Sequence, residues 1–236
     1  MSAKDNDLIL IEAIKWLGDI GCSEPLNSDK RDFYGLISNP EYFEEEKIDS
    51  KIPQNFNFEN IDNIKSLKKY LLSKIPDLNI NAFSYDGFEN SDLMVIGDKS
   101  DVNINNNEKP FHGEVGKLLD AMLKAIGFDQ SNTYYTNIYL LSDSIDKGMI
   151  NKIIKKQILI VQPKVIIMLG AEVTKILTNI DKSIFQTRGK WFDIEIDNIS
   201  NSIPGISMFH PRYILANLES KKETWEDLKA VRKKLT

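Results

Sequence analysis

The feature that most constrains the fold is a short apolar run that meets a glycine and then a long polar loop. Residues 93–96 read Leu-Met-Val-Ile, Gly97 follows, and the polar loop leads to an amphipathic helix that opens near residue 115. In open α/β sheets, a buried strand that ends in such a loop builds a ligand site at the carboxyl ends of the parallel strands. A loop of this length is usually functional or disordered.

From residue 92 onward, strands and helices alternate, which is typical of a parallel sheet covered by helices on both faces. We expect strands at residues 93–96, 134–138, 165–169 and 206–209, an edge strand or hairpin at 188–196, and helices at 116–126, 147–161, 171–177 and 219–235. The fold class is therefore α/β. We predict three α/β/α layers around a central, mainly parallel four-stranded sheet.

The N-terminal third has a different pattern. Apolar residues recur at helical spacing in residues 7–20 and again in 61–75, and the stretch between them is polar and irregular. We expect an N-terminal helical extension with a spacer over residues 1–78, and a folded domain over residues 79–236.

Composition narrows the class of protein. The chain has 236 residues, 42% of them apolar, and a net charge of −5, so a packed core is expected and a histone-like polycation is excluded. A local basic face can still bind nucleic acid. The N-terminus does not resemble a signal peptide and no stretch approaches the roughly 18 apolar residues of a membrane span. We expect a soluble, cytoplasmic monomer with no membrane partner.

Four predicted strand ends carry candidate site residues: Gly97, Asn137, Gly170 and His210. Each has a simple structural reading, namely a tight turn, a strand-end cap, a helix entry and a histidine that satisfies a backbone carbonyl. Their joint arrival at the carboxyl edge of one sheet favours a binding or catalytic site.

Six short motifs occur in order between residues 80 and 235. They are Gly97-Asp98, PFHGEVGKLL at 110–119, YYTNI at 134–138, the strand from PKV at 163–165 to Leu-Gly at 169–170, RGKW at 188–191 and HPRYIL at 210–215. Together they resemble the uracil-DNA glycosylase superfamily, and most closely its family 4 bacterial branch. The resemblance implies a DNA repair enzyme that flips uracil out of DNA and hydrolyses its N-glycosidic bond.

The resemblance also implies roles for single residues. Gly97, Phe111 and Asn137 match the base-binding positions, with Phe111 stacking on the base and the Asn137 amide reading its edge. His210 matches the group that stabilises negative charge on the leaving base, and Asp98 matches the catalytic carboxylate. The residues expected to contact DNA are Lys99, Arg188, Lys190, Arg212, Tyr213 and Leu215.

The chain also departs from the family pattern. Asp98 stands where the family has glutamate, no Pro-Gly follows it, and Ile104-Asn105 replace an acidic pair. The single cysteine, Cys22, cannot replace the four cysteines that hold an iron–sulfur cluster in typical members, so we expect no cofactor and no metal. The alternative function is an impaired module of this fold that binds single-stranded or damaged DNA. A nucleotide-binding protein outside repair is a weaker reading, because the loop after Gly97 lacks the spaced glycines of a phosphate loop.

Overall fold

The computed structural model describes residues 56–75, 84–98, 109–138, 146–197 and 201–236. The helix expected at residues 7–20, the predicted DNA contact Lys99 and the departures at Ile104 and Asn105 lie outside these ranges. Among the described helices, none is both long enough and apolar enough to cross a membrane.

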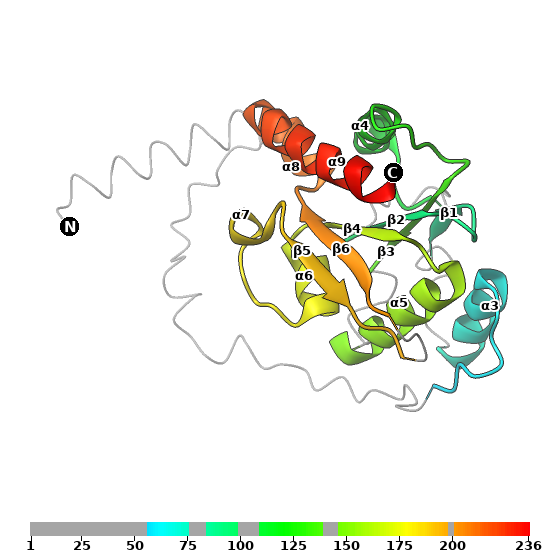
Figure 1. The fold of residues 1–236 in the computed structure, drawn as a ribbon. Helices are drawn as coiled ribbons and strands as arrows, with labels where there is room; N and C mark the ends of the chain where they lie inside the picture. The colour runs from blue at the N-terminus through cyan, green and yellow to red at the C-terminus, as the bar shows by residue number, and fades with distance from the viewer. Residues whose placement is uncertain (1–55, 76–83, 99–108, 139–145, 198–200) are drawn as a thin grey trace, which may run out of the picture. The chain divides into compact units, whose positions relative to one another are not determined.

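A single six-stranded sheet forms the centre of the fold, in the order β1-β3-β2-β4-β6-β5 (Figure 1). The strands are β1 (Tyr85–Gly87), β2 (Leu93–Gly97), β3 (Thr133–Asn137), β4 (Val165–Leu169), β5 (Trp191–Ile194) and β6 (Ile203–Met208). The four inner strands are parallel to one another, which confirms the predicted parallel centre. Both edge strands are antiparallel to their neighbours.

The predicted number of four strands was too low, because both edges of the sheet carry an additional strand. β1 has only three residues, and its Asp-Gly pair reads as a turn in the sequence. β5 lies within residues 188–196, for which the sequence analysis expects an edge strand or a hairpin.

Alternate side chains of the strands enter two separate cores, one on each face of the sheet. Met94 and Ile96 of β2 belong to a cluster that includes residues of α3, α5 and α6. Leu93 and Val95 belong to the other cluster, which includes residues of α4, α8 and α9. These helices are α3 (Ile64–Lys74), α4 (Gly113–Lys124), α5 (Lys147–Val161), α6 (Ala171–Thr178), α8 (Pro211–Ala216) and α9 (Lys221–Leu235). The predicted three layers are confirmed (Figure 1).

Helix α3 lies in the segment that the sequence analysis assigned to the N-terminal extension. Asn63 caps it, with its side chain accepting a hydrogen bond from the Ser66 N–H. Ile64, Leu67 and Leu71 recur at helical spacing and are completely buried in the same cluster as the sheet. The apolar face of α3 is therefore part of the core that supports the strands.

Candidate active site

The register of the sheet brings the predicted site residues to one edge. Gly97 and Asn137 are directly paired in the parallel ladder between β2 and β3, and the N–H of Ile138 donates to the Gly97 carbonyl at 2.9 Å. At the ends of β4 and β6, the N–H of Gly170 donates to the carbonyl of Met208 at 2.9 Å. Met208 lies two residues before His210. The four strand ends named in the sequence analysis therefore lie at the same carboxyl edge.

Asn137 has a fully buried side chain at the end of β3. Its Nδ2 donates a hydrogen bond to the backbone carbonyl of Pro110 at 2.9 Å. Its Oδ1 is also buried and accepts no hydrogen bond from any described residue. A buried amide oxygen without a donor costs free energy, and such groups often mark a site where a ligand supplies the missing partner.

Gly97 allows Asn137 and Phe111 to lie close together. A Cβ atom added at Gly97 would stand 2.3 Å from Asn137 Oδ1 and 2.7 Å from Phe111 Cζ, well inside contact distance. Any side chain at this position would therefore displace the amide, the ring or both. The glycine is required by this close approach.

Phe111 links the amide to the histidine. Its ring centroid lies 6.1 Å from that of His210 and 6.2 Å from that of Tyr135, which it meets edge to face. Tyr135 is almost completely buried, and burial raises the pKa of its phenol above the ordinary value. Phe111 itself is only partly buried and so retains an accessible surface.

His210 is held in one orientation by the helix that follows it. It occupies the N-cap of α8, and its Nδ1 accepts a hydrogen bond from the backbone N–H of Arg212 at 3.2 Å. An accepting Nδ1 carries no proton, so the ring proton lies on Nε2. Nε2 is 3.5 Å from Asp98 Oδ1, which follows directly after β2. His210 is 7% exposed, whereas the side chain of Asp98 is 30% exposed, so the imidazole is buried and the carboxylate is open to solvent on one side.

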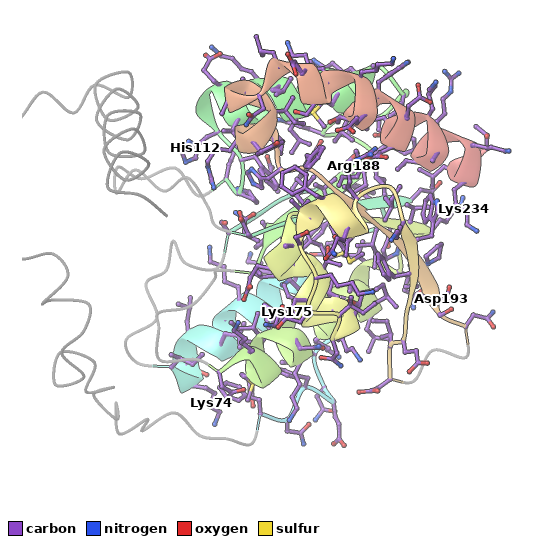
Figure 2. All side chains as sticks on the ribbon, turned by 90° about the vertical axis from the view of Figure 1, so that its left-hand side faces the viewer. Lys74, His112, Lys175, Arg188, Asp193 and Lys234 are labelled. Atoms are coloured by element: carbon purple, nitrogen blue, oxygen red, sulfur yellow. The ribbon has the colours of Figure 1, made fainter. Side chains whose placement is uncertain are left out.

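The expected DNA contacts differ in how they are held. Lys190, Arg212 and Leu215 are exposed, and Tyr213 packs its ring 4.8 Å from that of Phe209. Arg188, which is labelled in Figure 2, directly follows α7 (Ile184–Thr187). It forms a two-pronged ion pair with Asp227 of α9, with Nη2 2.6 Å from Oδ1 and Nε 3.2 Å from Oδ2. Its guanidinium thus has a structural role, and its contact with DNA remains a prediction.

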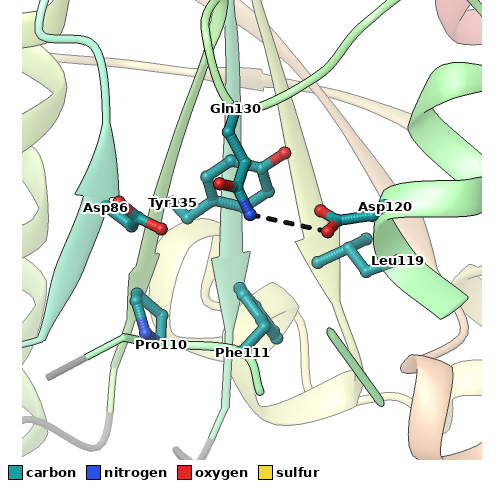
Figure 3. A pocket seen from close by; sticks show the side chains of 7 residues that line it. All are labelled: Asp86, Pro110, Phe111, Leu119, Asp120, Gln130 and Tyr135. Atoms are coloured by element: carbon teal, nitrogen blue, oxygen red, sulfur yellow. Dashed lines mark hydrogen bonds between the residues drawn. The ribbon is translucent and has the colours of Figure 1, made fainter. Parts of the chain in front are cut away.

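A shallow pocket adjoins the site on the Tyr135 side of Phe111 (Figure 3). It is lined by Asp86, Pro110, Phe111, Leu119, Asp120, Gln130 and Tyr135. Two of these residues are bonded to each other, since Gln130 Nε2 lies 3.5 Å from Asp120 Oδ2. Neither Asn137 nor His210 lines this pocket, so it is a neighbour of the candidate site and shares only the Pro110–Phe111 segment with it.

Two backbone groups that orient the candidate site were not predicted from the sequence. The Pro110 carbonyl fixes the Asn137 amide, and the Arg212 N–H fixes the tautomer of His210. Every residue carries such groups, so no residue type could have signalled them. The proline in the HPRYIL motif was an available signal for the second, because proline is common at the first position of a helix and so indicates a helix that starts after His210.

The chain's residues do not fit an iron–sulfur cluster held by four cysteines. Cys22 is the single cysteine of the chain, and one thiolate cannot replace four. Within the described ranges, no group of three or more His, Cys, Asp and Glu side chains is placed to hold a metal ion. We therefore assign no step of the chemistry to a cluster or a metal.

Comparison with known proteins agrees with this geometry. A sequence model of the Uracil DNA glycosylase superfamily matches residues 84–229, from the residue before β1 into α9. A Type-4 uracil-DNA glycosylase of Sulfurisphaera tokodaii is 26% identical over 188 residues, which cover 73% of this chain and 84% of the relative. A second, from Saccharolobus solfataricus, is 26% identical over 191 residues, covering 75% of this chain and 88% of the relative. These matches confirm the resemblance to family 4, and because the superfamily match covers more than half of the chain, the protein belongs to the uracil DNA glycosylase superfamily.

Proposed function

We propose that this protein removes uracil from DNA by hydrolysing the N-glycosidic bond of a flipped-out nucleotide. The observation that carries the proposal is the Asn137 amide, which is buried beside Phe111 with its orientation fixed and its oxygen without a donor. A base that lies between Asn137 and His210 would form hydrogen bonds along its edge with the Asn137 amide. On its other side it would face a proton donor, His210.

The fixed orientation of the Asn137 amide matches the hydrogen-bond donors and acceptors of uracil and mismatches those of cytosine. Nδ2 uses one N–H on the Pro110 carbonyl, which leaves one N–H and the Oδ1 acceptor for a ligand. Uracil offers the complementary pair, a donor at N3 and an acceptor at O4, whereas cytosine offers an acceptor and a donor in those places. Turning the amide to suit cytosine would set Oδ1 against the Pro110 carbonyl, two acceptors in contact. The backbone at Pro110 thus supports selectivity for uracil.

His210 and Asp98 are suited to the two charges that develop as the bond breaks. Negative charge appears on the leaving base, and the Nε2 proton of His210 can stabilise it. Positive charge appears on the sugar, and the Asp98 carboxylate can balance it or orient the attacking water. Phe111 can hold the base by stacking while both groups act.

The direct test is excision from uracil-containing oligonucleotides. Single-stranded and double-stranded DNA with one uracil is incubated with the protein and then treated with alkali, which breaks the strand at abasic sites. We expect strand breaks at the uracil position and none in matched DNA with thymine or cytosine there. Intact strands after prolonged incubation with folded protein would contradict the proposal.

The role of Asn137 can be tested separately with Asn137→Asp. A carboxylate cannot donate to the uracil O4 but can accept from the cytosine amino group, so we expect uracil excision to fall, or excision to shift toward cytosine. The measurement is the single-turnover rate on uracil and cytosine substrates. Asn151→Asp is the matched control, because the Asn151 amide also donates to a backbone carbonyl, that of Ile176, but lies between α5 and α6. If the rates in Asn137→Asp equal those of wild type, Asn137 has only a structural role, as a cap at the end of β3.

A second candidate function is a DNA-binding module without glycosylase activity. The observation that favours it is the sequence that follows β2, where a shorter carboxylate, Asp98, stands in the glutamate position and Ile104-Asn105 replace the acidic pair. Such a module would bind uracil-containing DNA and leave every base in place. The excision assay separates the two functions when it is combined with a measurement of DNA affinity.

A further inference from the structure

Phe185 is an exposed aromatic side chain that the chemistry above does not use. It is 66% exposed, the highest value among the large apolar side chains described as exposed. Its ring meets Phe209 at 5.7 Å and Tyr213 at 5.8 Å between centroids, edge to face in both cases, and those two rings lie 4.8 Å apart. The three rings form a continuous aromatic cluster from the core, where Phe209 is buried, to the surface.

The short helix that carries Phe185 is held firmly at both ends. A capping box between Ser183 and Gln186 closes the N-terminus of α7. At the other end, Thr187 is buried and accepts a hydrogen bond from the Ser207 hydroxyl at 3.2 Å. Arg188, which follows, is bound to Asp227 of α9. Phe185 therefore presents its ring to solvent from a rigid support, so little conformational entropy would be lost when it binds a ligand.

The cluster stands directly beside the candidate active site. Phe209 immediately precedes His210, and Tyr213 lies one turn later in α8, the helix that orients the His210 ring. Lys182 and Lys190 flank α7 in the chain; both are exposed, and within the described ranges neither forms an ion pair. Exposed aromatic rings and cations together are the groups by which proteins bind single-stranded nucleic acid, with bases stacked on the rings and phosphates bound by the cations.

We propose that Phe185 is a stacking platform for a nucleotide that flanks the extruded base. The inference rests on the proposed function, because it takes DNA as the ligand of the His210 edge. A base next to the flipped nucleotide loses one stacking neighbour, and the Phe185 ring replaces it. The platform thereby stabilises the opened strand, while Asn137 and Phe111 hold the extruded base.

The test measures binding of a single-stranded oligonucleotide that contains a tetrahydrofuran abasic analogue beside 2-aminopurine. The variants are Phe185→Leu, which keeps apolar cover over Phe209, and Phe185→Tyr, which keeps an aromatic ring. We expect Phe185→Leu to weaken binding by about fivefold or more and to lose the quenching of 2-aminopurine fluorescence, whereas Phe185→Tyr retains both. The dependence of affinity on salt should stay unchanged, because no phosphate contact is lost.

Phe88→Leu is the matched control. Phe88 is similarly exposed, at 59%, but its backbone N–H donates to the carbonyl of Thr133, the first residue of β3. It therefore lies at the amino ends of the parallel strands, whereas the candidate site lies at their carboxyl ends. This variant should bind as wild type does.

The outcomes separate the two proposals. If wild type excises uracil but Phe185→Leu binds and quenches as wild type does, the platform is overturned and excision stands. If binding depends on Phe185 but no uracil is excised, the platform stands and the glycosylase proposal falls. Absence of any DNA binding by wild type would overturn both.

Discussion

At the scale of single residues, Gly97 sets the geometry of the site. The ladder between β2 and β3 pairs it with Asn137, and the missing side chain leaves room for the amide oxygen and for the Phe111 ring. The backbone of β2 at Gly97 thus contacts two side chains from other segments, Asn137 and Phe111. A substitution at Gly97 would therefore alter the geometry of the candidate site while leaving all of its side chains in place.

Gly97→Ala should lower excision strongly while the protein still folds. The new Cβ would stand 2.3 Å from Asn137 Oδ1, so the amide or Phe111 must shift by a large fraction of an ångström or more. Displacements of about 1 Å can cost on the order of a hundredfold in rate, and we expect a loss of that order. The measurement is single-turnover excision of uracil, with thermal unfolding recorded alongside.

Gly205→Ala is the control for crowding a buried strand glycine. Its Cβ would meet Ile194 Cγ1 at 3.0 Å and Met168 Cε at 3.2 Å, which are core atoms away from the site edge. This variant should lose stability but keep its excision rate per folded molecule. Equal losses of rate in both variants would show that Gly97 acts through general stability.

The sequence predicted the side chains of the site better than the groups that orient them. Phe111, Asn137 and His210 stand in recognisable motifs, and the parallel topology explains why Asn137 and His210 share an edge. The Pro110 carbonyl and the Arg212 N–H were not predictable, because backbone groups are present at every position. Asp227, the partner of Arg188, lies 39 positions away in the chain, so only the fold brings them together.

At the scale of elements, α7 and α9 are connected through Arg188. Its guanidinium bonds to the Asp227 carboxylate and to the Glu223 carbonyl, and it lies over the Phe209 ring at 5.5 Å. Gly189 has a φ of +70° and would place a Cβ 2.7 Å from Asp227 Oδ1, so the chain turns tightly against this carboxylate. The connection fixes the segment that carries Phe185 against α9.

Burial raises the pKa of the Asp227 carboxyl above its ordinary value, and Arg188 opposes this shift without reversing it. Because the folded-state pKa exceeds that of the unfolded chain, protonation of Asp227 favours the folded state. The stability that this group contributes is therefore complete below the unfolded pKa and is lost as the pH rises through the folded pKa. Without Arg188, the pKa should rise further and the loss at neutral pH should grow.

Arg188→Met should therefore destabilise the protein more at pH 7 than at pH 4.5. Losing hydrogen bonds to a charged group costs about 1.5–3 kcal/mol, and we expect a loss in this range at pH 7, where Asp227 is ionised. At lower pH the carboxyl takes up a proton, and the difference from wild type should shrink. Urea unfolding of both proteins at the two pH values measures this.

Lys175→Met provides the comparison. Lys175 pairs with Asp181 at 2.7 Å, but that carboxylate is largely exposed, so its loss should cost only about 0–1 kcal/mol. An Arg188→Met variant whose loss is equally small, or independent of pH, would contradict the assigned role of the buried pair.

The elements that the sequence missed are the short ones. β1, α7 and α8 have three, four and six residues, too few to show a period, and their positions depend on contacts with distant segments. The helix at residues 147–161 was predicted to the residue, because it spans four turns and its apolar side chains recur at helical spacing. Length and periodicity thus decided which elements were visible in the sequence.

At the scale of the whole molecule, the chain combines a glycosylase fold with a composition that lacks cluster ligands. The superfamily match covers the sheet and most of its helices, while the only cysteine, Cys22, lies outside the matched residues. Hydrogen bonds to the Pro110 carbonyl and from the Arg212 N–H orient the candidate site residues Asn137 and His210.

The purified protein should be colourless and free of iron. One cysteine cannot supply the four thiolates of a cluster, so no absorption from iron–thiolate bonds is expected. Metal analysis and a visible spectrum of protein purified without oxygen measure this. Iron in a fixed ratio to protein, with absorption in the visible range, would be the contradicting result.

We propose that His210 acts on charge that develops as the glycosidic bond breaks. The most direct test compares wild type, His210→Ala and Asp98→Glu by single-turnover excision and by affinity for the same uracil-containing DNA. Loss of one preorganised donor typically lowers the rate about a hundred- to a thousandfold, and we expect His210→Ala to do so with little change in affinity. Asp98→Glu, which restores the family's longer carboxylate, should keep or raise activity. Measurable DNA binding by all three folded proteins without excision by any of them would contradict the account and leave a DNA-binding module.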